Sequence, residues 1–164
     1  MLGSLGVEAF RYHRWANLHL LDACAPLTEE QLELTAPGTY GTVAATLLHL
    51  LGAEQRYLAR FTGEEPKVGE KRGFPGVETL RAVAAESGDT LIDIAGRVDP
   101  DEEFETTFAN RPHRLRKGIV LLQALHHGND HRTHVCTVLG HHGISYGDMD
   151  VWAYGDAIGA IVEC

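Results

Sequence analysis

Histidine is concentrated near the end of this chain, where six of the ten histidines lie between positions 126 and 142. Successive residues of a helix turn by about 100°, so His127, His131 and His134 fall within an arc of roughly 60° on one helix face. Imidazoles on successive turns can point at one metal ion, as in HExxH helices, although no Glu follows His127 here. The spacing therefore predicts a ligand face for a divalent metal.

A metal needs at least one further ligand from another part of the chain. His49 is surrounded by leucines in Thr46-Leu-Leu-His49-Leu-Leu, and such a residue is expected to be buried. Taken alone, it is best explained as a core histidine bonded to a backbone carbonyl. Opposite a histidine-rich helix we favour metal binding instead. For His127 and His131 the ordinary alternative is a solvated polar face.

Periodic apolar residues predict four long helices that would position these histidines. The first spans residues 7–25, followed by the start of a short helical turn at 28–30. The second runs from a cap near Thr42 to residues 62–63, the third covers 76–98, and the fourth runs from near Lys117 to Leu139 or beyond. A polar linker at 64–75 joins the second and third helices.

The remaining segments contain no convincing pair of strands. Residues 104–108 are compatible with a short extended segment, and the basic run 111–117 is typical of a solvated loop. The tail from Asp150 is expected to form a short amphipathic piece that covers the bundle. We therefore predict an all-α four-helix bundle with a short C-terminal helical extension.

Length and charge narrow the class of protein. The 164 residues fit a single domain, 1–164, and 14 Lys plus Arg against 23 Asp plus Glu give a net charge of −9. That balance disfavours binding to nucleic acid or to an anionic membrane, and favours a small-molecule or protein partner.

Cys24, Cys136 and Cys164 lack CxxC spacing and are expected to be reduced thiols. Without a signal peptide or a long apolar run, we expect a cytoplasmic protein.

At these residues the sequence resembles the DinB-like (DinB/YfiT-like) family of four-helix metal proteins. The resemblance covers most of the chain and is carried by Trp15-Ala16-Asn17, by His49-Leu50 with Ala53-Glu54 and Tyr57-Leu58, by His127-x-x-x-His131-Arg132-Thr133, and by Asp150-Val-Trp-Ala-Tyr-Gly. It implies that His49, His127 and His131 form a three-histidine metal site opening into a cleft. The family includes transferases and isomerases that use thiols such as bacillithiol or mycothiol, but most members have no assigned reaction.

Two positions depart from the family pattern. His126 stands where the family commonly has Asn, and we expect it to be a polar flank or interface residue. His134 stands where the family often has Gln. Because it shares a helix face with His127 and His131, it is a candidate for a fourth ligand, for a residue that contacts a ligand from outside (an outer contact), or for a proton shuttle. The catalytic residues are not identified by the sequence, and His134 and Asp130 are the weak candidates.

Other polar residues are candidates for the surroundings of the site. Glu54 points about 140° away from His49 on its helix, so a structural role, such as pairing with Arg132, is expected rather than catalysis. Tyr57 follows His49 by eight positions and is a candidate outer contact. Three residues of the first helix are candidates to line the same cleft: Tyr12, His13 and Asn17.

The leading hypothesis is a metal-dependent transferase or hydrolase that acts on a small molecule, with a low-molecular-weight thiol as a candidate cosubstrate. Imidazole ligands favour zinc or nickel, with iron, manganese and copper as alternatives, and three ligands leave a position for water or substrate. The alternative is a non-catalytic, stress-related metal- or ligand-binding module that mainly dimerises. We expect a homodimer in either case.

Overall fold

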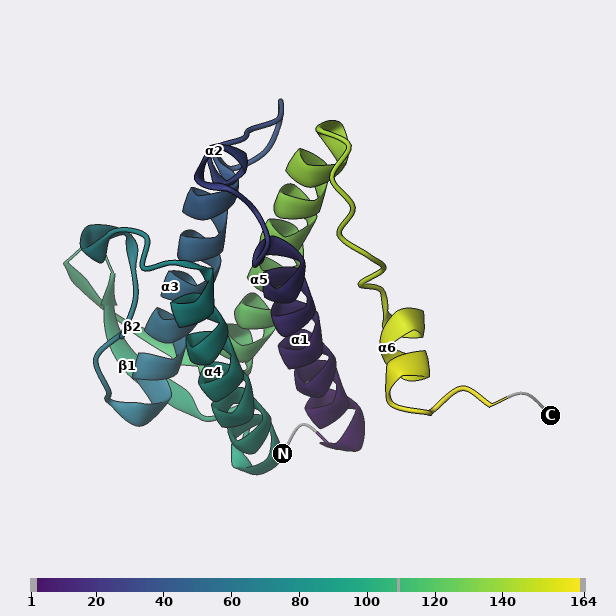
Figure 1. Ribbon diagram of the computed structural model, residues 1–164. Coiled ribbons are helices and arrows are strands. Elements are labelled where there is room, and N and C mark those ends of the chain that lie inside the picture. Colours follow the sequence, from purple (N-terminus) through teal and green to yellow (C-terminus); the bar gives the residue numbers. More distant parts are fainter. Residues whose placement is uncertain (1–2, 109, 163–164) are drawn as a thin grey trace.

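Four long helices form the body of the protein (Figure 1). The computed structural model describes residues 3–108 and 110–162, and these helices are α1 (Gly3–Cys24), α3 (Val43–Thr62), α4 (Val77–Arg97) and α5 (Lys117–His141). The shorter elements are α2 (Glu29–Leu32), a 3₁₀ turn η1 (Glu70–Arg72) and α6 (Val151–Ala157). The expected all-α four-helix bundle is confirmed.

Local side-chain chemistry accounts for several helix ends. The Thr42 hydroxyl accepts a hydrogen bond from the backbone N–H of Ala45 and so caps the start of α3. Gly63 ends α3 with a left-handed φ of 73°, which glycine adopts without strain. The expected short turn after the first helix is α2. Only the start of α1 differs appreciably from prediction, at Gly3 rather than residue 7.

The core consists of two apolar clusters stacked along the bundle, each built from all four long helices. Between them, each helix contributes at least one polar residue that is almost fully buried. Leucines dominate both clusters because they fill the space between helices with little loss of helix propensity. Representative members are Leu20, Leu47, Leu80 and Leu139 in one cluster and Phe10, Leu58, Leu91 and Leu121 in the other.

A β-hairpin interrupts the helical pattern before α5. Strand β1 (Glu103–Phe108) pairs antiparallel with β2 (Arg111–Arg116), so the predicted extended segment is confirmed, but the prediction of a solvated loop for the basic run was wrong. The pairing places Glu105 opposite Arg114, and opposite charges across a strand pair stabilise it. Asn110 takes the positive φ of 59° that the reversal needs. The same register places Phe104 opposite Leu115, and exposed and half-buried residues alternate along residues 103–107 of β1.

The C-terminal extension packs against α1. Figure 1 shows α6 beside α1, outside the four-helix body. Tyr154 is buried there, its ring meets Tyr12 at a centroid distance of 5.8 Å, and its hydroxyl donates to Glu8. Trp152 of the same helix is 76% exposed. The extension therefore covers part of α1 and presents apolar side chains on its other face.

Two of the three cysteines lie within the described residues. Cys24 and Cys136 are free thiols, whereas Cys164 lies outside the described residues. Burial raises the pKa of Cys24 to about 12 and that of Cys136 to about 11, so neither is activated as a nucleophile near neutral pH. None of the helices in the described parts of the chain is long and apolar enough to cross a membrane.

Candidate metal centre

Three histidines from two helices converge at one point of the bundle. His49 belongs to α3, and His127 and His131 lie one turn apart on α5. The Nε2 atoms of His49 and His127 are 3.1 Å apart, and a potential ligand atom of each of the three residues lies within 4.8 Å of the others. A tetrahedral cation bonded to nitrogen at about 2.0–2.1 Å needs nitrogens about 3.3 Å apart. The arrangement is therefore close to that of a three-histidine site.

The two histidines of α5, His127 and His131, are neutral near neutral pH in the folded protein. His131 is buried, whereas His49 and His127 are half-buried. Burial, reinforced by the neighbouring imidazoles, lowers the pKa of His127 and of His131 to about 4. A metal binds the neutral imidazole, so these rings need not lose a proton near neutral pH before they can act as ligands.

The residues present fit a divalent metal ion. Nδ1 of His131 is buried and, among residues 3–108 and 110–162, has no hydrogen-bond partner. A buried polar atom without a partner is costly, and its presence in a native site calls for a missing water, ion or ligand. The convergent donors are all imidazole nitrogens, the ligand type that suits zinc, nickel, copper and iron.

A carboxylate from the connection between α3 and α4 holds His49 in place. Oε1 of Glu70, in η1, lies 2.7 Å from Nδ1 of His49, while its Oε2 accepts a hydrogen bond from Arg56 at 3.0 Å. Burial alone would raise the pKa of Glu70, but hydrogen bonds from its own backbone N–H, from His49 and from Arg56 lower it to about 2. The carboxylate is therefore ionised and accepts a hydrogen bond from the Nδ1–H group of His49. Nε2 of the same ring is then left unprotonated and can bind a metal.

Tyr40, in the loop before α3, covers the same histidines. Its ring stacks on His49 at a centroid distance of 4.2 Å and meets His131 edge-on at 5.0 Å, and its hydroxyl lies 3.0 Å from Nδ1 of His49. Sequence reasoning missed both Tyr40 and Glu70. Each lies in a connection without helical periodicity, so no spacing related either residue to His49.

The two weak catalytic candidates occupy different surroundings. His134 lies next to the centre: its ring meets that of His131 at 5.2 Å, and its Nδ1 is buried without a hydrogen-bond partner among the described residues. Asp130 is exposed and pairs with His126 at 3.2 Å, so His126 is the polar flank expected of it. The candidate outer contact Tyr57 lies edge-on to His127 at 5.8 Å.

The other predicted surroundings of the site are arranged differently from expectation. Glu54 makes no direct hydrogen bond to Arg132; it contacts His13 and Asn17, and these two residues contact Arg132. His13 and Asn17 are each 1% exposed and belong to the bundle core. The expectation that they line an open cleft was wrong, because their side chains point into the bundle interior, where they meet Glu54 of α3 and Arg132 of α5. Tyr12 of α1 instead donates its hydroxyl to the backbone oxygen of Met149.

Fold and site together define an all-α bundle protein with a three-histidine cluster able to hold a metal ion. Residues 1–158 match the DinB family, and the chain belongs to that family. Among solved structures, a DinB-like protein from Bacillus cereus ATCC 10987 is similar with a TM-score of 0.67 and 18% sequence identity, over 87% of this chain and 94% of that one. This similarity supports the fold. Comparison with curated proteins finds no match.

Proposed function

We propose that this protein binds a divalent metal ion through His49, His127 and His131 and uses it in a transferase or hydrolase reaction on a small molecule. The observation that supports this most is the convergence of three imidazoles, two of them with pKa values lowered to about 4, on one point within reach of solvent. Three protein ligands are typical of catalytic zinc sites, which keep a position for water or substrate.

A bound divalent metal would supply a Lewis acid that makes a coordinated water or thiol nucleophilic near neutral pH. The residues of this chain supply the orientation. Glu70 holds the Nδ1 proton of His49 and thereby directs Nε2 toward His127. The ring of Tyr40 stacks on His49 and meets His131 edge-on, which restricts the orientation of both imidazoles. We propose zinc or nickel as the metal and a low-molecular-weight thiol as the cosubstrate.

Elemental analysis of the wild type and of His127→Ala tests the metal site. The wild type is expected to carry close to one equivalent of zinc or nickel after loading, and the variant much less. X-ray absorption should then count three imidazole nitrogens and at least one further light-atom neighbour, which a small thiol replaces with sulfur. Loaded protein whose metal exchanges neither water nor thiol would contradict the proposed reaction class.

The second candidate function is a metal-binding module without catalysis, and His134 favours it. Its ring lies 5.2 Å from that of His131 and has a buried nitrogen without a partner in the described part of the chain. A small shift could make it a fourth ligand and close the coordination shell, as in structural zinc sites. Four imidazole nitrogens in the absorption spectrum, reduced to three in His134→Ala, would support this alternative over the enzyme.

We propose further that the protein is a cytoplasmic homodimer of one domain per chain. Apolar side chains exposed outside the core support an interface between copies: Trp152 is 76% exposed, Leu122 62% and Ile119 46%. The reduced thiols of Cys24 and Cys136 are consistent with a reducing compartment. Sedimentation equilibrium of the wild type and of Trp152→Ser tests the dimer, and a monomeric wild type would contradict it.

A further inference from the structure

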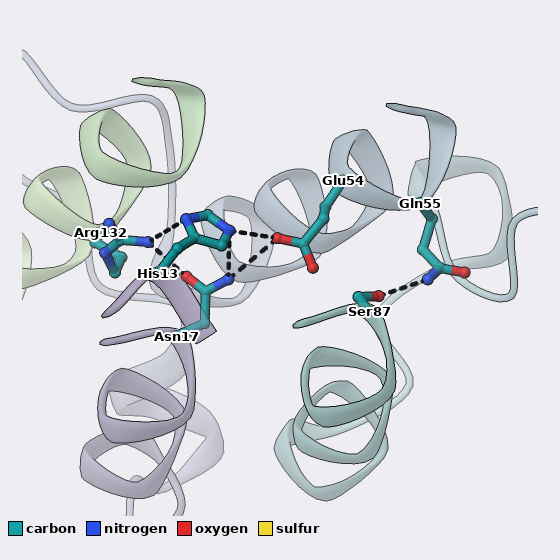
Figure 2. Close-up of polar contacts among 6 residues, drawn as sticks. All are labelled: His13, Asn17, Glu54, Gln55, Ser87 and Arg132. Atoms are coloured by element: carbon teal, nitrogen blue, oxygen red, sulfur yellow. Dashed lines mark hydrogen bonds and ion pairs between the residues drawn. The ribbon is translucent and has the colours of Figure 1, made fainter. Parts of the chain in front are cut away.

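Four polar side chains form a buried quartet between the two apolar clusters of the core. They are His13 and Asn17 of α1, Glu54 of α3 and Arg132 of α5, and they are exposed by 1%, 1%, 2% and 5% respectively (Figure 2). Polar residues this deeply buried need partners, and here the partners are chiefly one another. The quartet therefore joins three of the four long helices at one level of the bundle.

Hydrogen bonds lead through the quartet in one direction, from Arg132 to Glu54. Nη1 of Arg132 donates to Oδ1 of Asn17 at 2.7 Å and to Nδ1 of His13 at 3.2 Å. Because Nδ1 of His13 accepts, its proton is on Nε2, which donates to Oε2 of Glu54 at 2.7 Å. Nδ2 of Asn17 donates to the same oxygen at 3.2 Å. A cation on α5 is thus linked to an anion on α3 through two side chains of α1.

Stability alone does not explain this arrangement. Removing two charges from water is costly, and replacing a buried ion pair by apolar residues of similar size is often neutral or stabilising. Oε1 of Glu54 adds to the cost, because it is buried without a hydrogen-bond partner among the described residues. A directional polar network fixes one defined register between helices, which an apolar contact does not.

Two members of the quartet, Glu54 and Arg132, lie on the helices that carry the candidate ligands. Glu54 follows His49 by five residues on α3, and Arg132 directly follows His131 on α5. Gly128, next to His127, permits the approach of α1, because a Cβ atom there would collide with the ring of His13. The distance between His49 of α3 and the two candidate ligands of α5 is therefore set close to the level at which the quartet links these helices.

We propose that the buried quartet is a positioning device, which holds α3 and α5 in the register that lets His49, His127 and His131 reach one cation. The inference rests on the proposed metal site. Its four members act through the helix positions of the ligands and do not touch the reacting atoms. Loss of the network should therefore loosen the metal site more than it destabilises the fold.

The test compares zinc affinity and thermal stability in two variants and one control. In Glu54→Leu/Arg132→Met both charges are replaced by apolar side chains, so no buried charge is left unpaired. Asn17→Ala is milder, since it removes hydrogen bonds but no charge. Ser87→Ala is the control, because it breaks a hydrogen bond of 2.7 Å between α3 and α4, and α4 carries no candidate ligand (Figure 2).

We expect zinc affinity to fall at least tenfold in the double variant and at least threefold in Asn17→Ala, measured by chelator competition well below each melting temperature. X-ray absorption should show fewer or more disordered nitrogen neighbours than in the wild type. Ser87→Ala should keep wild-type affinity even if its melting temperature drops.

Wild-type zinc affinity in folded Asn17→Ala, or in the double variant, would overturn the inference and leave the proposed metal site intact. An equal loss of affinity in Ser87→Ala would overturn it too, because general loosening of the bundle would then explain the effect. A wild-type protein that takes up no zinc would overturn the metal site and this inference together.

Discussion

Oε1 of Glu70 lies 2.7 Å from Nδ1 of His49, although 21 residues separate the two in the chain. The contact ties a loop to a helix, and it orients the imidazole so that Nε2 faces His127. A carboxylate that accepts the second N–H of a ligand histidine fixes both its tautomer and its ring orientation, and it makes the imidazole a stronger ligand. Among the outer contacts of the site, Glu70 is therefore the one whose loss should reduce metal affinity most directly.

Glu70→Ala should weaken zinc binding by about 10- to 100-fold, the range typical of such outer contacts. Isothermal titration of the metal-free protein with zinc measures the effect. Glu86→Ala is the matched control, since it removes an exposed carboxylate whose ion pair is with Lys67. Equal affinity in the two variants would contradict the orienting role of Glu70.

Gly128→Ala should destabilise the protein by about 1–3 kcal/mol, because the added methyl group would collide with the buried ring of His13 and force the helices apart. Gly140→Ala in the same helix is the control. There the nearest atom outside the helix backbone lies at an ordinary 3.5 Å, so the better helix propensity of Ala should raise stability by about 0.5–1 kcal/mol. Urea denaturation of both variants measures the change in the free energy of unfolding, which should be negative for Gly128→Ala and positive for Gly140→Ala.

The metal-free protein should lose stability as the pH falls from about 6.5 toward 4. His127 and His131 have pKa values lowered to about 4 in the folded state from a usual 6.5, so in this window the unfolded chain takes up protons that the folded chain does not. Above the usual pKa neither state binds these protons and the effect disappears. Chemical denaturation at several pH values measures it.

The matching control for this pH dependence is the double variant His127→Gln/His131→Gln. It lacks both groups and should show a shallower decline over the same range. A decline as steep as that of the wild type would mean that other groups cause the loss of stability.

Zinc should raise the melting temperature of the wild type. At a free concentration of 100 times the dissociation constant, binding to the folded state alone adds about 2.7 kcal/mol, or roughly 5–11 °C for a chain of this size. His49→Ala should abolish most of the shift, because it removes the only ligand that α3 contributes to the cluster in the described residues. A shift that survives this substitution would place the zinc elsewhere on the protein.

The local sequence pattern was sufficient to predict the four long helices of the bundle. Apolar residues at helical spacing, a threonine cap at Thr42 and a glycine stop at Gly63 predicted α3 nearly to the residue. The second strand was not predicted because β2 is mostly exposed and basic and has no apolar alternation of its own; it is held by its pairing with β1, which places Glu105 opposite Arg114 and Phe104 opposite Leu115. A strand that is held mainly by its partner strand need not show a period in its own sequence.

The sequence by itself determined which histidines share a face of α5 and that His49 belongs to another helix, because the period of a helix fixes side-chain directions over a few turns. Only the tertiary structure decided that Glu70 and Tyr40 meet His49, and that Glu54 reaches Arg132 through His13 and Asn17. Contacts of this kind depend on how separate elements pack, and no regular spacing along the chain encodes them.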